Sequence, residues 1–310
     1  MFDNGRVAIL AEALAFPEGP IYTAEGDVLV VEVKGATLTR VRPNGAHEIV
    51  SQHVGGPNGA ALGPDGRVYV CNNGGLSWVS SQSFGTRPAF PSQPPGYTGG
   101  SIERVDIRTG RVERLYERSD QAPLRGPNDL VFDDHGGFWF TDTGKGQERT
   151  SERGSVCYAR ADGSLCTEAI FPLVQPNGIG LSPDGSRLYV AETLTARLWA
   201  FDVVGPGALA LKPYPSPNGG ELVYTAPGYR LLDSLAVEAC GNVCVGTIFD
   251  GGISVISPEG ELVEHIALED THVTNLCFGG PQLEVAYVTL SSSGRLASVK
   301  WPRAGLRLAY

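Results

Sequence analysis

The chain has 310 residues, 42% of them hydrophobic and 19% charged, which is the composition of a folded globular protein and not of a disordered one. Its formal net charge of −10 disfavours binding to nucleic-acid phosphates, and the sequence has no apolar run of about 18 residues that could cross a membrane. The first residues lack the basic start of a signal peptide, and the six cysteines form no CxxC pair, so we expect a cytoplasmic protein with free thiols.

Taken in chain order, the predicted elements are short β-strands separated by turns rich in glycine, asparagine and aspartate. RVAILAEAL near the N-terminus predicts one strand, and six similar units follow it. Four units have a polar residue, a short apolar strand, an Asp- and Gly-rich turn, and a second strand in which aromatic and β-branched residues alternate, and the units around Glu18 and Asn275 are weaker copies. The polar residues are, in order, Glu18, Asn58, Asn128, Asn177, Asp233 and Asn275. Further strand pairs, such as TLTRVRPNGAHEIV and SIERVDIRTGRVERLY, lie between them.

A unit of about four strands that occurs six times predicts an all-β protein, a six-bladed β-propeller with four-stranded blades. The last unit supplies only TNLCFGG, EVAYVTL and RLASVKW, which is one strand short of a blade. We therefore expect the N-terminal strand to complete the last blade, which closes the ring and removes a sheet edge. The tail RLAY could compete for that place. Residues 1–310 would then form one domain.

One long insertion interrupts the second unit at about 77–100, with the sequence SWVSSQSFGTRPAFPSQPPGYTGG. It contains four prolines and the aromatic residues Trp78, Phe84, Phe90 and Tyr97. The simple interpretation is a surface loop with some packed aromatic side chains. The functional interpretation is a lid over the mouth of the propeller, whose aromatic side chains line an apolar part of a pocket. In the third unit, Cys157 and Cys166 flank a turn and could face each other across a hairpin.

The six polar residues precede the first strand of their units, and the first strand of a propeller blade lines the central channel. We therefore expect six oxygen-bearing side chains at one mouth of the channel, among them the carboxylates of Glu18 and Asp233. Two carboxylates in a narrow channel repel each other and lose hydration, and a bound cation removes that conflict. Carboxylate and amide oxygens suit hard ions such as calcium, magnesium or manganese. For Asn58 and Asn275 the alternative is a tight turn with Asx-type hydrogen bonds.

The chain resembles the senescence marker protein, gluconolactonase and regucalcin family of propeller lactonases at FPEGPIY, RGPNDLVFDDHGGFWFTDT, QPNGIGLSPDGSRLYVAET and VTNLCFGGP, in this order. The resemblance implies a six-bladed propeller with one divalent metal ion held by Glu18, Asn177 and Asp233. Asn128 would be a weaker ligand or a substrate contact, and Arg125 would contact the substrate. Calcium is the first expectation for the ion, with manganese, magnesium, zinc or iron as alternatives.

The resemblance also implies a reaction, the hydrolysis of a lactone, with Asp233 as the proposed general base. The metal would polarise the lactone carbonyl, and Asp233 would accept a proton from the attacking water. Direct activation of water by the metal is the alternative. This chain reads Asp-Ser at residues 233–234, where the family often reads Asp-Gly. Asn58 is a further expected substrate contact, and the large insertion predicts a lactone less polar than a simple sugar lactone.

Three more residues are candidates for the channel mouth. Asp142 ends a second strand in FTDTG, His272 lies just before the last unit, and Trp78 belongs to the insertion. His272 could act as a base, although a plain histidine at the rim is the simpler expectation. For Asp142, and for Asp129 beside Asn128, structural hydrogen bonding is likewise the simpler role.

Two other classes of function fit the same sequence. One keeps the propeller and the metal but performs isomerase or lyase chemistry, and the other is a non-enzymatic calcium-binding propeller. Arg125 and Asn128 beside the metal ligands favour an enzyme, because metal binding alone does not need them. The expected partner is a small-molecule substrate, and no obligate protein partner is implied.

Overall fold

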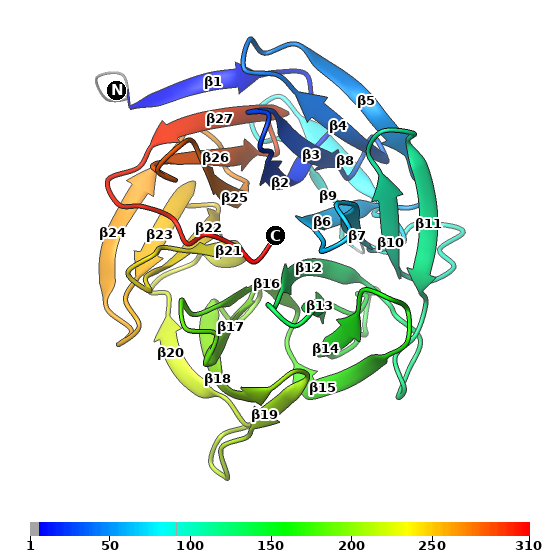
Figure 1. The fold of residues 1–310 in the computed structure, drawn as a ribbon, viewed down its shortest axis with the longest axis vertical. Helices are drawn as coiled ribbons and strands as arrows, with labels where there is room; N and C mark the ends of the chain where they lie inside the picture. Colours follow the sequence, from blue (N-terminus) through cyan, green and yellow to red (C-terminus); the bar gives the residue numbers. More distant parts are fainter. Residues whose placement is uncertain (1–5, 91) are drawn as a thin grey trace.

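The computed structural model describes residues 6–90 and 92–310 and places six antiparallel sheets, the blades, around a central channel (Figure 1). Blade 1 contains β2 (Pro17–Tyr22), β3 (Val28–Glu32), β4 (Thr37–Val41) and β5 (His47–Gln52), and blade 2 contains β6 (Pro57–Leu62), β7 (Val68–Asn72), β10 (Ser101–Asp106) and β11 (Arg111–Tyr116). Blade 3 contains β12 (Pro127–Phe132), β13 (Gly137–Asp142), β14 (Gly154–Arg160) and β15 (Cys166–Leu173).

Blade 4 contains β16 (Pro176–Leu181), β17 (Arg187–Glu192), β18 (Arg197–Gly205), β19 (Ala208–Ala210) and β20 (Glu221–Thr225). Blade 5 contains β21 (Leu231–Val237), β22 (Val243–Ile248), β23 (Gly252–Ile256) and β24 (Leu262–Ala267), and blade 6 contains β25 (Val273–Gly279), β26 (Val285–Leu290), β27 (Arg295–Lys300) and β1 (Val7–Ala11). The predicted six-bladed propeller is therefore confirmed. Blade 4 carries one extra strand, because the long strand β18 pairs with both β19 and β20.

The ring is closed by the N-terminal strand, as predicted. β1 pairs antiparallel with β27, with Val7 opposite Val299. The C-terminal tail, all of it within the described residues, forms no strand and does not compete for that place. It runs instead to the centre of the ring (Figure 1). There the backbone N–H of Leu306 donates to the carbonyl of Val237 at 2.8 Å, and Tyr310 packs edge-on against Phe132.

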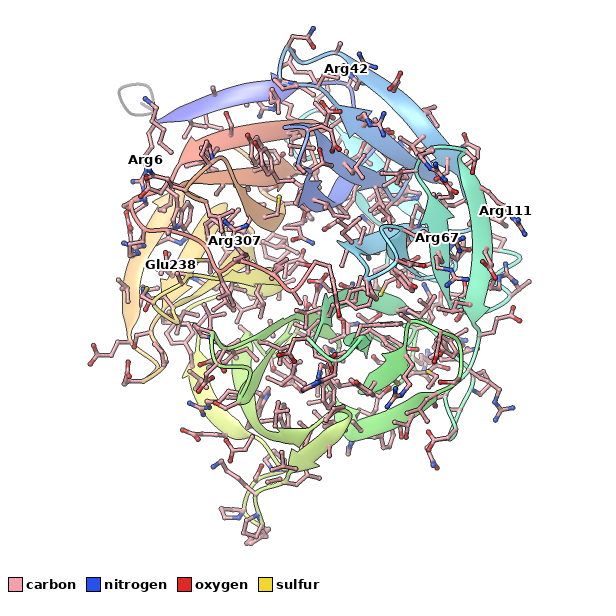
Figure 2. All side chains as sticks on the ribbon, viewed as in Figure 1. Arg6, Arg42, Arg67, Arg111, Glu238 and Arg307 are labelled. Atoms are coloured by element: carbon pink, nitrogen blue, oxygen red, sulfur yellow. The ribbon has the colours of Figure 1, made fainter. Side chains whose placement is uncertain are left out.

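The tail is held by a buried carboxylate beside it. Glu238 is labelled in Figure 2 and accepts hydrogen bonds from Trp301 Nε1 and from Arg303 Nε, each at 2.7 Å. Val237 and Phe132 are the last residues of two innermost strands, whereas Glu18 and Asn128 stand near the starts of theirs. The tail therefore covers the end of the channel opposite to the predicted site.

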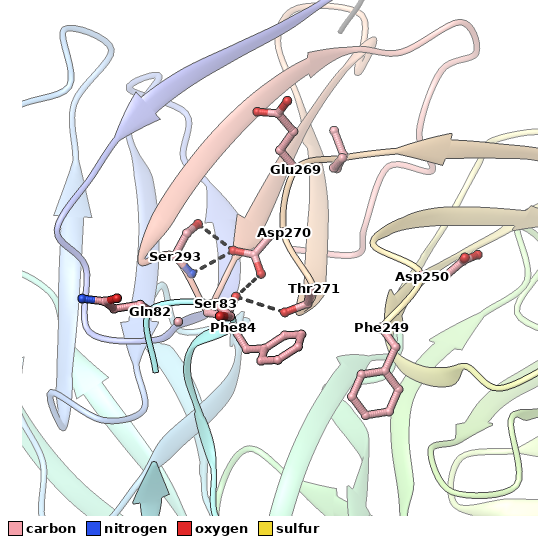
Figure 3. A pocket seen from close by; sticks show the side chains of 12 residues that line it. Gln82, Ser83, Phe84, Phe249, Asp250, Glu269, Asp270, Thr271 and Ser293 are labelled. Carbon is pink, nitrogen blue, oxygen red and sulfur yellow. Dashed lines mark hydrogen bonds between the residues drawn. The ribbon is translucent and has the colours of Figure 1, made fainter. Parts of the chain in front are cut away.

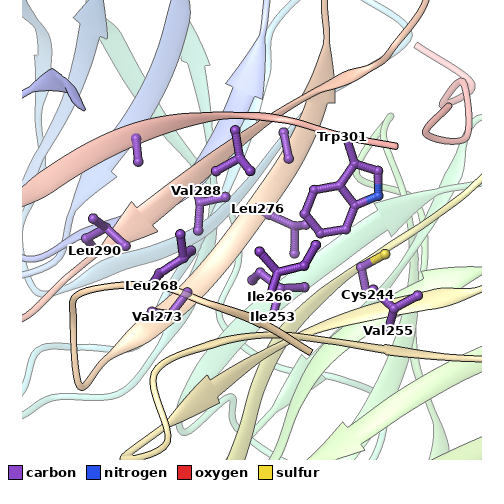
Figure 4. Close-up of a cluster of buried hydrophobic side chains, with 13 residues drawn as sticks. Cys244, Ile253, Val255, Ile266, Leu268, Val273, Leu276, Val288, Leu290 and Trp301 are labelled. Atoms are coloured by element: carbon purple, nitrogen blue, oxygen red, sulfur yellow. The ribbon is translucent and has the colours of Figure 1, made fainter. Parts of the chain in front are cut away.

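Apolar side chains fill the spaces between neighbouring blades. The described residues form six buried clusters, and each cluster draws its members from two adjacent blades. Figure 4 shows the cluster between blades 5 and 6, which includes Cys244, Ile253, Val288 and Trp301. A strand such as β3 is buried on both faces, because alternate residues face alternate neighbours, and this explains its continuous valine-rich sequence.

The insertion carries a two-stranded ribbon, β8 (Trp78–Ser81) and β9 (Gly85–Pro88). The ribbon leaves blade 2 and reaches blade 6, where the N–H of Thr86 donates to the carbonyl of Ser292 at 3.0 Å. Residue 91 of the insertion and residues 1–5 of the expected domain lie outside the described residues. Within the described residues, no helix is long and apolar enough to cross a membrane.

The six cysteines are all free within the described part of the chain. Cys157 and Cys166 lie on the neighbouring strands β14 and β15, but they are not opposite each other. Cys157 pairs with Glu168, and Cys166 pairs with Ala159. The sequence alone had left this pair open.

Candidate functional site

Five of the six predicted polar residues meet at one end of the channel, near the starts of the innermost strands. These residues are Glu18, Asn58, Asn128, Asn177 and Asp233, and all five are buried. Each innermost strand contacts the two beside it, so the strand starts form a closed ring. In every blade the pairing of the innermost strand with its neighbour shifts at this position. Such bulges re-aim side chains, which is how six strands turn polar groups toward one point.

The sixth position of the ring belongs to Thr274 and not to Asn275. Asn275 makes the same contacts as Asp129, the residue after the ring position in blade 3. The N–H of Asn275 donates to Thr289 Oγ1 at 2.9 Å, and the N–H of Asp129 donates to Thr141 Oγ1 at 3.1 Å. Each side chain then accepts the N–H of the following leucine. The expected ring position in blade 6 was therefore one residue out, although the side chains of Thr274 and Asn275 both lie beside Glu18 and both lower its pKa.

Polar residues at the ends of the second strands accept hydrogen bonds from the loops that lead into the innermost strands, and so fix the positions of the ring residues. Asp142 is the fullest example, since it accepts the backbone N–H groups of Arg125 and Gly126 at 2.7 Å and of Gly144 at 2.9 Å. The equivalent residues in blades 1, 2 and 4 are Glu32, Asn72 and Glu192, and each accepts a backbone N–H from the loop before its own innermost strand. The structure thus gives Asp142, a candidate for the mouth, a structural role beside the ring.

Three buried carboxyl groups gather in the channel. Burial raises the pKa of Glu18 to about 7, and hydrogen bonds from Thr274, Asn275 and Gly19 only partly oppose the shift. Burial, and then the negative charge of Glu18, hold the pKa of Asp233 well above its usual range. Burial likewise raises the pKa of Asp129 to about 7, and Glu18 adds to that shift. Repulsion between like charges in a desolvated site is the conflict that a cation relieves.

The side chains of the ring fit a hard divalent cation. Asn128 Oδ1 is buried and has no hydrogen-bond partner among the described residues. Buried acceptors are nearly always satisfied in proteins, so this oxygen requires a donor or a cation. Asn177 is held in place, because its Nδ2 donates to Thr193 Oγ1 at 3.1 Å and its Oδ1 accepts from Ser234 Oγ at 3.2 Å.

The donor set is made of oxygen atoms alone. Within the described residues, no group of three or more His, Cys, Asp or Glu side chains is arranged to hold an ion. The ring is consistent with that finding, because only two of its members, Glu18 and Asp233, are of these residue types. Amide and carboxylate oxygens in this proportion suit calcium better than zinc or iron.

Arg125 lies at the rim of the mouth and is already paired. Its guanidinium contacts the Glu152 carboxylate at 3.0 Å and stacks over the ring of Tyr97 at 5.1 Å. Lys145 approaches the same ring, with Nζ 5.1 Å from its centroid, and donates to the carbonyl of Gly75 at 3.0 Å. Burial, and also the charge of Arg125, lower the pKa of Lys145 to about 8. Tyr97 thus fastens the C-terminal part of the insertion to blade 3.

A row of aromatic side chains crosses the other side of the mouth. Trp78 packs on Phe16 with ring centroids 4.9 Å apart, and His272 contacts both Phe16 and Phe249 edge-on at 6.2 Å. His272 stands two residues before Thr274, just ahead of β25, and its Nδ1 is 3.1 Å from Thr271 Oγ1. Burial holds the pKa of His272 below its usual value, which favours the neutral imidazole.

Comparison with known proteins now identifies the family. A family described as the SMP-30/Gluconolactonase/LRE-like region matches residues 16–292. The chain belongs to this family. The resemblance seen at four sequence stretches is therefore confirmed. Relatives in the SMP-30/gluconolactonase/LRE-like family include the lactonase drp35 of Staphylococcus saprophyticus, which is 27% identical over 81% of this chain and 69% of its own length. A gluconolactonase of Zymomonas mobilis is 25% identical over 88% of this chain and 76% of its own length.

Solved structures agree with the family assignment at the level of the fold. A gluconolactonase from Xanthomonas campestris superposes with a TM-score of 0.74 at 22% identity, over 96% of this chain and 89% of that one. The calcium-binding protein regucalcin from Agrobacterium tumefaciens superposes with a TM-score of 0.73 at 17% identity, over 97% of both chains. At these identities the likeness supports the propeller fold of the SMP-30/gluconolactonase/LRE-like family and nothing finer.

Two features of this family member's site were not predicted from its sequence. Asp129 was assigned a structural role, but in the structure its negative charge helps to raise the pKa of Asp233, and the charge of Glu18 helps to raise the pKa of Asp129. Lys145 was not predicted as a site residue, although it follows the aromatic second strand and the Thr-Gly turn of blade 3 in the stretch GFWFTDTGK. Nothing in the local sequence indicates that Tyr97, far away in the chain, buries it.

Proposed function

We propose that the protein is a metal-dependent hydrolase that opens a lactone ring. The observation that carries the proposal is the pair of buried carboxyl groups, Glu18 and Asp233, which face one end of the channel beside the unpartnered Asn128 Oδ1. Relatives named lactonase and gluconolactonase supply the reaction class. A cyclic ester is also a small molecule, which suits a site enclosed by six strands.

Glu18, Asn177 and Asp233 would hold the ion, with Asn128 as a fourth oxygen ligand. Calcium is the ion we propose, because the donors are hard oxygens and because a structural relative, regucalcin, is described as calcium-binding. A bound divalent cation would supply positive charge for the oxyanion that develops on the lactone carbonyl. The residues around it position the carbonyl and keep bulk water out.

Asp233 is the proposed general base. It would take one proton from the attacking water and pass it to the ring oxygen as the acyl–oxygen bond breaks, which gives a hydroxy acid. Ser234 and Asn177 fix the surroundings of Asp233 through the hydrogen bond between them. His272 is the second candidate base, because it is buried near the same mouth and burial keeps it neutral.

Asn58 and Asn128 are proposed to contact the substrate from blades 2 and 3. Arg125 would join them at the rim, where it would have to exchange its contact with Glu152 for the substrate. The ribbon β8–β9 is proposed to act as the lid of the mouth, since it bridges blade 2 and blade 6. Trp78 on β8, which packs on Phe16, would make this wall aromatic, which favours a lactone less polar than a simple sugar lactone.

The proposal is tested by a panel of lactones and acyclic esters assayed with the calcium-loaded protein. We expect turnover of at least one lactone, with weaker or no turnover of acyclic esters of the same carbon number. Hydrolysis of acyclic esters alone, or of no ester in the panel, would overturn the proposed function.

A further inference from the structure

A cleft of about 450 Å³ lies at the mouth between the tip of the ribbon β8–β9 and the loops of blades 5 and 6 (Figure 3). Its walls and floor are formed by segments 82–85, 249–250, 268–271 and 292–293. This volume is in the range of pockets that bind small molecules. Its lining, taken over the described residues, includes none of the six ring positions. The cleft is therefore a neighbour of the proposed catalytic site and not the site itself.

Two exposed phenyl rings stand on opposite walls of the cleft. Phe84 at the tip of the ribbon is 55% exposed, and Phe249 from the loop after β22 is 45% exposed. Figure 3 shows both side chains beside the opening. Phe249 is stacked on Tyr229 with centroids 5.3 Å apart and planes inclined by 13°. Large apolar groups that remain in water on both sides of a hollow indicate a surface that an apolar ligand covers.

The ribbon tip that carries Phe84 is held in place by hydrogen bonds to the floor of the cleft, which segments 268–271 and 292–293 form. Thr86, next to the turn, donates its N–H to the carbonyl of Ser292, whose hydroxyl hydrogen-bonds both Asp270 and Thr271. Gly85 has a φ of 62°, and a Cβ there would collide with the backbone of Ser292. The turn therefore approaches blade 6 as closely as glycine allows, and the ribbon tip has a fixed position over the cleft.

The Phe249 wall is tied to the same segment. The N–H of Phe249 donates to the carbonyl of Thr271 at 2.7 Å, and its ring contacts His272. Asp270 in the floor accepts the N–H of His272 at 2.7 Å and the N–H of Ser293 at 2.8 Å. Both oxygens of its carboxylate therefore already accept hydrogen bonds from the protein backbone.

Two further acidic side chains, Asp250 and Glu269, also line the cleft, and Asp250 forms an ion pair with Arg230 at 3.0 Å. The exposed apolar surface of the cleft therefore comes from Phe84 and Phe249.

The cleft also connects with the proposed active site. His272 follows the floor residue Thr271 directly and stands two residues before the ring residue Thr274, just ahead of β25. Its ring also contacts Phe249, which lines the cleft, with centroids 6.2 Å apart, so His272 lies between the cleft and the start of β25. A ligand whose reacting ring lies at Glu18 and Asp233 would extend past His272 to reach Phe249 and Phe84.

We propose that this cleft binds the hydrophobic substituent, an n-alkyl or aryl group, of a substituted lactone. The inference rests on the proposed function, because it places the lactone ring at the carboxylate pair. It assigns substrate selectivity to Phe84 and Phe249, neither of which takes part in the chemistry. Phe90 of the same insertion is 80% exposed and does not line the cleft, so it provides a matched control.

The experiment measures kcat/KM for an unsubstituted δ-lactone and for δ-lactones with n-alkyl side chains of increasing length. In the wild type we expect kcat/KM to rise by up to about fourfold for each methylene that the cleft buries. Phe84→Ala and Phe249→Ala should flatten this rise and change the unsubstituted lactone by less than about twofold, because they remove contact area and no catalytic group. Phe90→Ala should behave as the wild type.

An unchanged rise in both Phe84→Ala and Phe249→Ala would overturn the inference while leaving the proposed function intact. Absence of any lactone turnover in the wild type would instead overturn the proposed function. In that case, calorimetric titration of the same alkyl lactones still decides the cleft. The cleft proposal is supported if affinity grows with chain length in the wild type and in Phe90→Ala but not in Phe84→Ala or Phe249→Ala. The proposal is refuted if the affinities are equal in all four proteins.

Discussion

The buried carboxyl groups make a prediction about stability that needs no substrate. In the metal-free protein the pKa of Glu18 is about 7, whereas its ordinary value is 4.5. Between these two pH values the folded protein keeps a proton that the unfolded chain has lost. Folding is therefore coupled to proton uptake, and the stability from Glu18 is full below about pH 4.5 and lost as the pH passes about 7.

The size of the effect follows from the shift. A pKa shift of about 2.5 units at about 1.4 kcal/mol each corresponds to a loss of about 3–4 kcal/mol of unfolding free energy from Glu18. The pKa of Asp129 is raised from 3.8 to about 7 and acts in the same window. The two groups repel each other, so their contributions do not simply add. For a domain whose stability is about 5–15 kcal/mol, this is a large fraction.

The assay is urea unfolding in the presence of a chelator, repeated at about pH 5 and about pH 8, with and without added calcium. We expect the chelated protein to be less stable at the higher pH, and calcium to stabilise it more there, because protons no longer compete for the ligands. Glu18→Gln should reduce the pH dependence. Equal stability of the chelated protein at both pH values, or an unchanged dependence in Glu18→Gln, would refute the account of these carboxyl groups.

Three further predictions concern the scaffold and the base. Gly178→Ala places a Cβ within 2.6–2.7 Å of the backbone of blade 5 beside Asp233. We expect it to lower the free energy of unfolding by about 1–3 kcal/mol and also to lower turnover. The control is Gly146→Ala, whose Cβ meets nothing within 4 Å and should change neither quantity. Deleting the chain up to Ala11 should expose the edge of β27, and size-exclusion chromatography with thermal melting should show association and a lower Tm. Asp233→Asn should lower kcat by about 10²–10⁴, and His272→Gln by less than about tenfold; the reverse order would make His272 the base.

The fold was predictable because each unit of the sequence repeats one local pattern. Period-two alternation, the polar residue before each strand and the Gly-containing turns gave six blades, and the missing strand of the last unit gave the closure by β1. The extra strand of blade 4 was not predictable, since Ala208–Ala210 is too short to have a pattern of its own.

Five of the six ring positions were predictable from the same repeat, but the effect of the bulge on the residue that follows each of them was not. A regular strand would place Asp129 on the face opposite to Asn128, and the sequence cannot show that pairing shifts between Pro127 and Leu130. In blade 6 the ring position is Thr274, and the amide of the next residue, Asn275, was taken for it because the other asparagines of the repeat stand at the ring position. The cleft was hidden for another reason, because it joins segments that lie more than a hundred residues apart.

The central claim is that one divalent ion, held by Glu18, Asn177 and Asp233, is required for lactone opening. The most direct measurement follows lactone turnover across a calcium titration of the metal-free protein, with ion binding measured by calorimetry under the same conditions. We predict one ion per chain and turnover that rises with the same midpoint as binding. Full turnover in the presence of a chelator, with no ion bound, would contradict the claim.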